Sequence, residues 1–306
     1  MLDVFLQTLP FFLLIAFGFG AGRSGFFPAE ATTWLTRFVF YFALSAMLFR
    51  FAASLSLSEV FEINAVAAYA AGSLVVYGIA TSLALIRQRG IEEAAIEAQC
   101  AVVGNVGFLG VPMLAMLLGP EAIGPVMLVL ACDLILFGSL IVIVITARRD
   151  GRLSPAVLIS IGRGLMANPM IVSITLGLIW AALNLPMPQP MDDFLTLLGA
   201  AATPGALFAI GASLAGKSAE RLTVASWLSF AKLVLHPLAV AVTALILFQV
   251  DALTAKVMIA AAALPVAGNV YILAQHYGVA PQRASAAILV STTLSIVTLS
   301  AIIAAL

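Results

Sequence analysis

The chain has 306 residues, of which 63% are hydrophobic and only 9% carry a charged side chain. Soluble domains are about 45–50% apolar and about 25% charged, so this composition excludes an ordinary soluble protein. The 14 basic and 14 acidic residues cancel to a formal net charge of zero. This balance gives no basic surplus for a nucleic-acid partner, and the mean hydropathy of +1.16 excludes a disordered chain.

The apolar residues are gathered in runs whose length fits a lipid bilayer, since a spanning helix needs about 20 mostly apolar residues. The sequence therefore predicts an all-α polytopic membrane protein with ten transmembrane helices. Asp3 stands where a signal peptide would carry positive charge, so we expect the first run to be retained as a helix. The ten runs are 4–22, 32–53, 62–86, 94–118, 122–147, 165–185, 192–215, 223–249, 255–277 and 284–305.

Basic residues are unevenly distributed between the connections. The even-numbered connections and both termini hold only Lys256. Because cytoplasmic loops carry an excess of Lys and Arg, the odd-numbered connections are expected in the cytoplasm. Both termini and the 186–191 loop are then expected on the outer side of the cytoplasmic (inner) membrane. The odd-numbered connections hold Arg23, Arg87, Arg89, Arg148, Arg149, Arg152, Arg163, Lys217, Arg221 and Arg283.

The two halves of the chain, 1–153 and 154–306, resemble each other when one is shifted along the other. Each half contains five predicted helices, an odd number, so the second half enters the membrane from the opposite side. A 5+5 inverted repeat of this kind is typical of secondary transporters. The matching positions are Pro10 with Pro169, Gly18 with Gly177, 46–54 with 205–213, and Gly104-Asn105-Val106 with Gly268-Asn269-Val270.

The fourth and ninth predicted helices both contain helix breakers, at Gly107 and Pro112 in one and at Pro265 in the other. Proline removes a backbone donor, and glycine lowers helix propensity by about 1 kcal/mol. Non-helical backbone at membrane depth persists only where it is buried or lines a cavity. Paired interruptions in the two halves therefore indicate a substrate site, although kinked, continuous helices that bind nothing are an alternative.

The two helices are expected to unwind near Asn105 and Asn269, so that their broken segments cross within the membrane. Freed backbone N–H groups and the positive ends of the half-helices would stabilise a carboxylate. Each asparagine offers a donor and an acceptor. The two side chains either contact this ligand or cap the freed backbone, and the sequence leaves both interpretations open.

Four ionisable residues within the predicted helices are candidates for ion coupling or charge balance, because such residues are costly inside a membrane. They are Asp133, Glu97, Lys232 and His236. Lys232 and His236 are four residues apart and share a helix face. Asp133 has to be paired, protonated or solvated; Lys232 is its possible structural partner, and a proton or substrate role is the alternative.

Patterns of catalytic, metal-binding or cofactor sites are absent from the sequence, which contains two histidines and no HExxH, CxxC, GxGxxG or P-loop motif. Cys100 and Cys132 lie within apolar runs and are expected to be packing residues. The sequence thus predicts no enzyme activity, no cofactor and no metal site.

Four segments, 36–49, 104–114, 202–216 and 263–279, resemble the auxin efflux carrier family. This family includes bacterial carriers, some assigned to malonate, and the plant PIN-type auxin exporters. The likeness covers essentially the whole chain. Many relatives have proline where this sequence has Ser45, whereas Pro204 keeps the equivalent place in the second half.

The resemblance implies a fold similar to bile-acid symporters and sodium/proton antiporters, in which the interrupted helices 4 and 9 cross. It further implies a scaffold of helices 1, 2, 6 and 7, a transport part of helices 3–5 and 8–10, and a homodimer formed through the scaffold. Transport would proceed by an elevator-like shift of the transport part. The family pattern places the substrate carboxylate among Asn105, Asn269, Gly104, Gly268 and Val270.

The leading interpretation is a secondary carrier for a small organic anion, a malonate- or auxin-like carboxylate, with no nucleic-acid partner. One alternative is a sodium-coupled symporter of the bile-acid type, which would need an oxygen-rich cation site. The other alternative is a membrane sensor that uses the same pocket without transporting its ligand.

Overall fold

The computed structural model describes residues 2–54, 62–150, 159, 162–163, 166–216 and 222–306, and these residues are almost entirely helical. The predicted boundary at 153 and 154 lies outside the described residues, as do the basic residues Arg152, Lys217 and Arg221. Among the described residues, the one β feature is an isolated antiparallel bridge between Gly104 and Val266. The prediction of an all-helical, polytopic membrane protein is confirmed.

In the part of the chain that the structure describes, six helices are long and apolar enough to cross a membrane by length and composition. Shorter apolar helices accompany them at Phe12–Arg23, Val106–Leu118, Pro169–Ala182 and Ala252–Ala262. The six long helices are Ala29–Ser54, Ile63–Ile86, Pro120–Arg149, Gln189–Ala215, Thr223–Leu247 and Pro281–Ala305.

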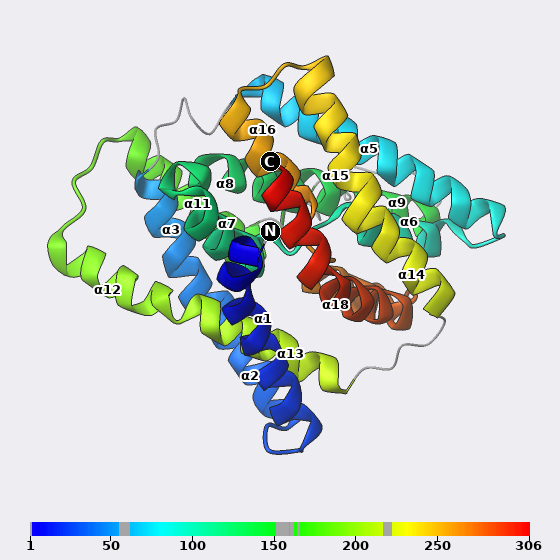
Figure 1. Ribbon diagram of the computed structural model, residues 1–306, viewed down its shortest axis with the longest axis horizontal. Helices are drawn as coiled ribbons and strands as arrows, with labels where there is room; N and C mark the ends of the chain where they lie inside the picture. The colour runs from blue at the N-terminus through cyan, green and yellow to red at the C-terminus, as the bar shows by residue number, and fades with distance from the viewer. Residues whose placement is uncertain (1, 55–61, 151–158, 160–161, 164–165, 217–221) are drawn as a thin grey trace.

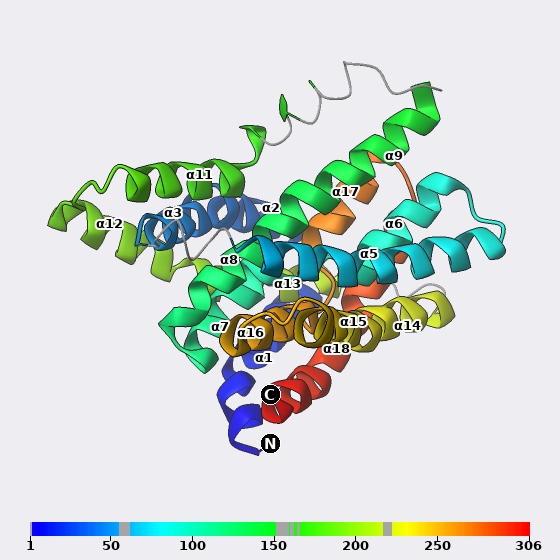
Figure 2. The same cartoon turned by 90° about the horizontal axis from the view of Figure 1, so that it is seen from above.

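The helices pack in two groups, and in both views α3, α11 and α12 of one group lie on the side opposite to α5, α6 and α14 of the other (Figures 1 and 2). In one set of helices, which we call the first group, α1 packs against α13, α3 packs against α11, and α12 lies along α3. It contains α1 (Leu2–Arg23), α2 (Ala29–Phe38), η1 (Val39–Ala43), α3 (Leu44–Ser54), α11 (Pro169–Ala182), α12 (Gln189–Ala200) and α13 (Ala202–Ala215).

Glycines allow the close packing within the first group. A Cβ atom built on Gly18 of α1 would lie 2.1 Å from the backbone oxygen of Phe208 in α13. A Cβ atom on Gly177 of α11 would lie 2.6 Å from the backbone oxygen of Phe49 in α3. Small residues let membrane helices approach this closely. Gly18 and Gly177 are also the pair that the sequence shift aligns.

The remaining helices form the second group, in which α5 packs against α6 and α15, and α14 packs against α18. Its first half comprises α5 (Ile63–Ile86), α6 (Ile91–Val102), η2 (Val106–Gly110), α7 (Val111–Leu118), η3 (Pro120–Ala122), α8 (Ile123–Ala131), η4 (Cys132–Phe137) and α9 (Gly138–Asp150). Its second half comprises α14 (Leu222–Phe230), η5 (Ala231–Leu235), α15 (His236–Ala241), η6 (Val242–Leu247), α16 (Ala252–Ala262), α17 (Gly268–Tyr277) and α18 (Pro281–Ala305).

Several helices widen locally into π-helical turns, at η1, η2, η4, η5 and η6. Such turns disturb the regular hydrogen-bond ladder and often occur at functional sites. The hydroxyl of Ser45, at the start of α3, donates to the Phe40 carbonyl of η1 at 3.0 Å. At the end of η4, the Gln99 side-chain amide donates to the Phe137 carbonyl. Side chains therefore satisfy carbonyl groups at two of these turns.

Candidate functional site

The fourth and ninth predicted helices are both interrupted in the structure. Helix α6 ends at Val102, Val103 is extended, and the chain becomes helical again at Val106. Helix α16 ends at Ala262, and α17 begins at Gly268. The second interruption therefore precedes Asn269, which lies in the first turn of α17. We call residues 103–105 and 263–267 the paired breaks.

The paired breaks run antiparallel and are hydrogen bonded to each other. The Asn105 N–H donates to the Pro265 carbonyl at 2.8 Å, and the Ala267 N–H donates to the Val103 carbonyl at 3.1 Å. The Val266 N–H donates to the Ser291 hydroxyl of α18 at 3.1 Å. Backbone groups that helices would otherwise satisfy thus find partners inside the protein, as the membrane requires.

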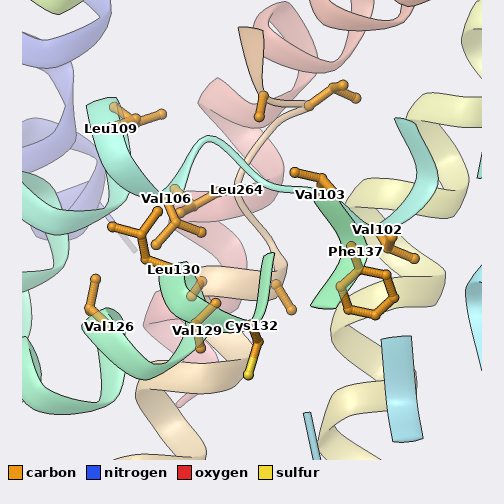
Figure 3. Close-up of a cluster of buried hydrophobic side chains, with 14 of the residues drawn as sticks. Val102, Val103, Val106, Leu109, Val126, Val129, Leu130, Cys132, Phe137 and Leu264 are labelled. Atoms are coloured by element: carbon orange, nitrogen blue, oxygen red, sulfur yellow. The ribbon is translucent and has the colours of Figure 1, made fainter. Parts of the chain in front are cut away.

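Apolar side chains surround the paired breaks. Figure 3 shows Val103 and Val106 at either end of the irregular connection that follows α6, with Leu264 of the other break nearby. Leu130 and Cys132, from α8 and η4, lie below them in this view. All five side chains are buried. The breaks therefore lie in the interior of the second group.

Two buried residues of opposite charge bind the backbone at the paired breaks. The Gly104 N–H donates to Asp133 Oδ2 at 3.2 Å, and Lys232 Nζ donates to the Ala262 carbonyl at the end of α16. A cation at this position complements the negative C-terminal end of the helix dipole. Asp133 lies in η4 and Lys232 in η5, so both side chains project from π-helical turns.

Three further buried side chains join these charges. The Tyr69 hydroxyl donates to Asp133 Oδ1 at 2.8 Å. His236 Nδ1 lies 3.2 Å from Lys232 Nζ, and His236 Nε2 lies 2.8 Å from the Ser73 hydroxyl. Sequence reasoning predicted the charged residues and missed Tyr69 and Ser73. Their spacing of four residues in an apolar run was the available signal, since it places both on one face of α5.

The two asparagines lie at opposite ends of the paired breaks. Asn105 is buried, and Asn269 is partly buried beside buried Val270. The Asn269 side-chain oxygen is buried and has no hydrogen-bond partner among the described residues. A Cβ atom built on the exposed Gly268 would meet no atom within 4 Å, so there is space at the start of α17.

The predicted helix breakers have different positions in this site. Pro265 lies within a paired break and supplies the carbonyl that binds Asn105. Pro112 lies at the start of α7, where a helix tolerates proline. Gly107 follows the first break, and a Cβ atom on it would lie 2.4 Å from the Met170 side chain of α11. Gly107 thus allows η2 to approach the first group.

Glu97 lies away from the paired breaks, although it was a coupling candidate with the other three charged residues. It is fully buried and binds two arginines, Arg87 and Arg283, the latter at 3.0 Å. Arg283 also binds Glu93 at 2.9 Å. These pairs connect α6 to the end of α5 and the start of α18.

A neighbouring ion pair joins Arg149 of α9 to Glu92 of α6 at 3.0 Å. The Arg149 guanidinium lowers the pKa of the Glu92 carboxyl through this hydrogen bond. Arg149 also donates to the Tyr277 carbonyl of α17 at 2.7 Å. The ion pairs of Glu92, Glu93 and Glu97 therefore bind α6 to its neighbours in the second group.

A metal site has no support in the part of the chain that the structure describes, because no three His, Cys, Asp or Glu side chains gather there as a metal would require. The site instead combines exposed and buried N–H groups, two amides and one charge pair. This chemistry suits a small polar or anionic ligand.

Comparison with known proteins identifies the family of this chain. Residues 3–303 match the family described as "Membrane transport protein". The chain is also 30% identical, over 299 residues, to a protein of Rhizobium meliloti (strain 1021) named "Putative malonate transporter", covering 97% of this chain and 93% of the relative. Both descriptions are of transporters and not of enzymes. The chain therefore belongs to the membrane transport protein family, the family of the auxin efflux carriers.

Proposed function

We propose that this protein is a secondary transporter that moves a small organic anion across the membrane and binds it at the paired breaks. The observation that carries the proposal is the hydrogen-bonded pairing of two interrupted helices beside the open start of α17. Interrupted helices at corresponding positions mark the substrate site in several transporter folds.

The chemistry of the site favours a carboxylate. The first turn of α17 has backbone N–H groups without partners inside the helix, and its dipole favours negative charge there. Asn269 offers a buried amide whose oxygen lacks a partner among the described residues. An unpaired buried polar group costs about 1–3 kcal/mol, which a ligand in contact with the amide would offset. The relative named for malonate supports the same substrate class.

The architecture that we propose is a 5+5 inverted repeat of ten transmembrane helices. Each of the ten predicted runs overlaps helices of the structure. The packing of α1 on α13 through Gly18, and of α11 on α3 through Gly177, supports this repeat. The N-terminal end of α1 and the C-terminal end of α18 lie close together in both views, which supports the same side for both termini (Figures 1 and 2). The excess of basic residues in the odd-numbered connections favours the outer side of the inner membrane for both.

The first group is the proposed scaffold, through which a homodimer would form, and the second is the proposed transport part. All ion pairs among the described residues join two residues of the same group. The contacts between the groups include apolar ones, among them the Phe40 and Phe108 rings with centroids 6.4 Å apart and Met170 against Gly107. An apolar boundary without ion pairs suits an elevator-like shift of one group along the other.

The proposal is tested by uptake of radiolabelled malonate into proteoliposomes that contain the purified protein, with protein-free vesicles as the control. We expect saturable uptake that unlabelled carboxylates inhibit. Imposed sodium gradients test the sodium-coupled alternative, in which malonate uptake would be faster only when a sodium gradient is present. Malonate binding without uptake would support the sensor alternative, and neither binding nor uptake of any carboxylate would contradict the proposed function.

A further inference from the structure

Asp133 already makes the contact that a substrate carboxylate would make. Its Oδ2 accepts the Gly104 N–H within a paired break, and its Oδ1 accepts the Tyr69 hydroxyl. The side chain is almost fully buried. As long as this carboxylate is charged, the Gly104 N–H is occupied, so an incoming carboxylate has to compete for it.

Lys232 supplies a positive charge that balances the Asp133 carboxylate beside Gly104. A Cβ atom built on Gly104 would lie 3.3 Å from Lys232 Nζ, so the ammonium and Asp133 both lie against this glycine. The empty site therefore has no net charge. A bound substrate carboxylate would add one negative charge, and an uncompensated charge at this depth is costly. One proton on Asp133 would restore the balance.

Three fully buried polar side chains, His236, Ser73 and Tyr69, lie between Lys232 and Asp133. A lysine ammonium only donates, so His236 Nδ1 accepts and His236 Nε2–H donates to the Ser73 hydroxyl. Ser73 lies one helical turn from Tyr69 on the same face of α5, and the Tyr69 hydroxyl donates to Asp133. The Tyr69 and His236 rings also contact edge to face, with centroids 5.7 Å apart.

We propose, building on the proposed function, that Asp133 holds the place of the substrate carboxylate and is displaced when a proton reaches it through His236, Ser73 and Tyr69. One proton is then carried with each substrate molecule. The described titratable groups that face this chain are its own members and Cys132, the neighbour of Asp133 in η4.

The proton transfer is balanced at every atom. Lys232 releases one ammonium proton to His236 Nδ1, and Nε2 releases its proton to the Ser73 oxygen. Ser73 passes its hydroxyl proton to the Tyr69 oxygen, and Tyr69 passes its own to Asp133 Oδ1. Lys232 regains a proton from water on the side to which the site opens. After translocation Lys232 releases a proton to water on the other side, and the same transfers run in reverse, which restores the starting tautomer of His236 and the charged Asp133. The substrate carboxylate then binds the Gly104 N–H and faces the Lys232 ammonium, while Asp133 is a neutral acid.

The electrical charge moved per malonate tests this proposal. Malonate is a dianion at neutral pH, so wild-type protein in proteoliposomes should move one negative charge per malonate and acidify the lumen. Asp133→Asn cannot take up the proton, so it should move two negative charges per malonate and lose the acceleration by an imposed pH gradient. A merely structural Asp133 would leave the charge per malonate unchanged, which overturns the proposal.

The relay is tested separately by Ser73→Ala, which leaves Asp133 and Lys232 in place. Proton transfer by a positioned side chain contributes about a hundredfold in rate, so we expect a loss of this order in uptake, with unchanged malonate affinity. Ser295→Ala is the matched control, because Ser295 is a buried hydroxyl that donates to the Thr292 carbonyl of its own helix.

Equal uptake rates in Ser73→Ala and Ser295→Ala would overturn the proposed relay. This test remains valid if the Asp133→Asn protein fails to fold. If wild-type protein takes up malonate without proton movement, the inference fails and the proposed function stands. If wild-type protein neither binds nor moves any carboxylate, the proposed function fails as well.

Discussion

At the scale of single residues, the structure separates the buried charges into two sets. Asp133 and Lys232 bind opposite kinds of backbone group at the paired breaks, the Gly104 N–H and the Ala262 carbonyl. Glu97 instead binds Arg87 and Arg283 at the edge of the second group. The first set lies where the substrate is proposed to bind, whereas the second connects helices.

Glu97→Gln is expected to lower the stability of the protein strongly. Removing one partner from a buried ion pair costs about 3–5 kcal/mol, because the remaining charge loses its compensation. Glu92→Gln is the matched control on the same helix, because water screens the exposed pair of Glu92 with Arg149 and its loss should change the stability little. Thermal unfolding in detergent measures both. A Glu97→Gln protein as stable as Glu92→Gln, yet unable to transport, would instead indicate a coupling role.

The sequence indicated which residues are costly to bury but not what they contact. A charge in an apolar run identifies Asp133, Lys232 and Glu97 equally. Their partners come from helices far away in the chain, such as Arg283 for Glu97. Sequence reasoning missed Tyr69 and Ser73 because tyrosine and serine are common in membrane helices and carry no formal charge.

At the scale of helices, the breakers predicted that two helices are interrupted, and the tertiary structure determines where. In the ninth run the break lies at 263–267, where Pro265 lacks a donor, and Gly268 begins the next helix. The π-helical turns could not be predicted, since the runs are apolar on all faces and their widening depends on distant groups such as Gln99. Propensity therefore predicts the presence of a break better than its bounds.

Gly18→Ala is expected to destabilise the packing of α1 on α13. The new Cβ atom would lie 2.1 Å from the Phe208 backbone oxygen, and overpacking of this kind costs about 1–3 kcal/mol. Gly20→Ala is the matched control, because a Cβ atom there meets no atom within 4 Å and alanine favours a helix by about 1 kcal/mol. Equal melting temperatures for both variants would contradict this close packing.

At the scale of the whole molecule, the two groups differ in what holds them together. Ion pairs connect helices within each group, such as Arg50 with Asp192 at 2.6 Å in the first. The contacts between groups include apolar pairs such as Phe40 with Phe108. This difference is the physical basis for treating each group as a unit that could move against the other.

Cross-linking Phe40→Cys to Phe108→Cys with a reducible bifunctional thiosulfonate should block malonate uptake, because the link would join the two groups, and reduction should restore uptake. The control pair is Phe49→Cys with Trp180→Cys, whose rings lie 6.0 Å apart within the first group. Cross-linking this pair should leave uptake unchanged. Full uptake by the cross-linked Phe40–Phe108 variant would contradict the elevator-like movement.

The orientation in the membrane is testable by cysteine labelling from outside the cell. Gln189→Cys in the predicted outer region should react with a membrane-impermeant maleimide, and Ser24→Cys in the first cytoplasmic connection should react only after permeabilisation. Both positions are exposed, and the native cysteines are buried and give little background. The opposite labelling pattern would contradict the predicted orientation of the protein in the membrane.

The central claim is that the paired breaks bind the anion through Asn105 and Asn269, and a double-mutant cycle of malonate binding tests it most directly. Loss of a hydrogen bond to a charged ligand costs about 1.5–3 kcal/mol, so each of Asn105→Ala and Asn269→Ala should weaken binding about ten- to a hundredfold. Because both side chains contact one ligand, the double variant should lose less than the product of the two effects. Native affinity in both single variants, measured on folded protein, would contradict the claim.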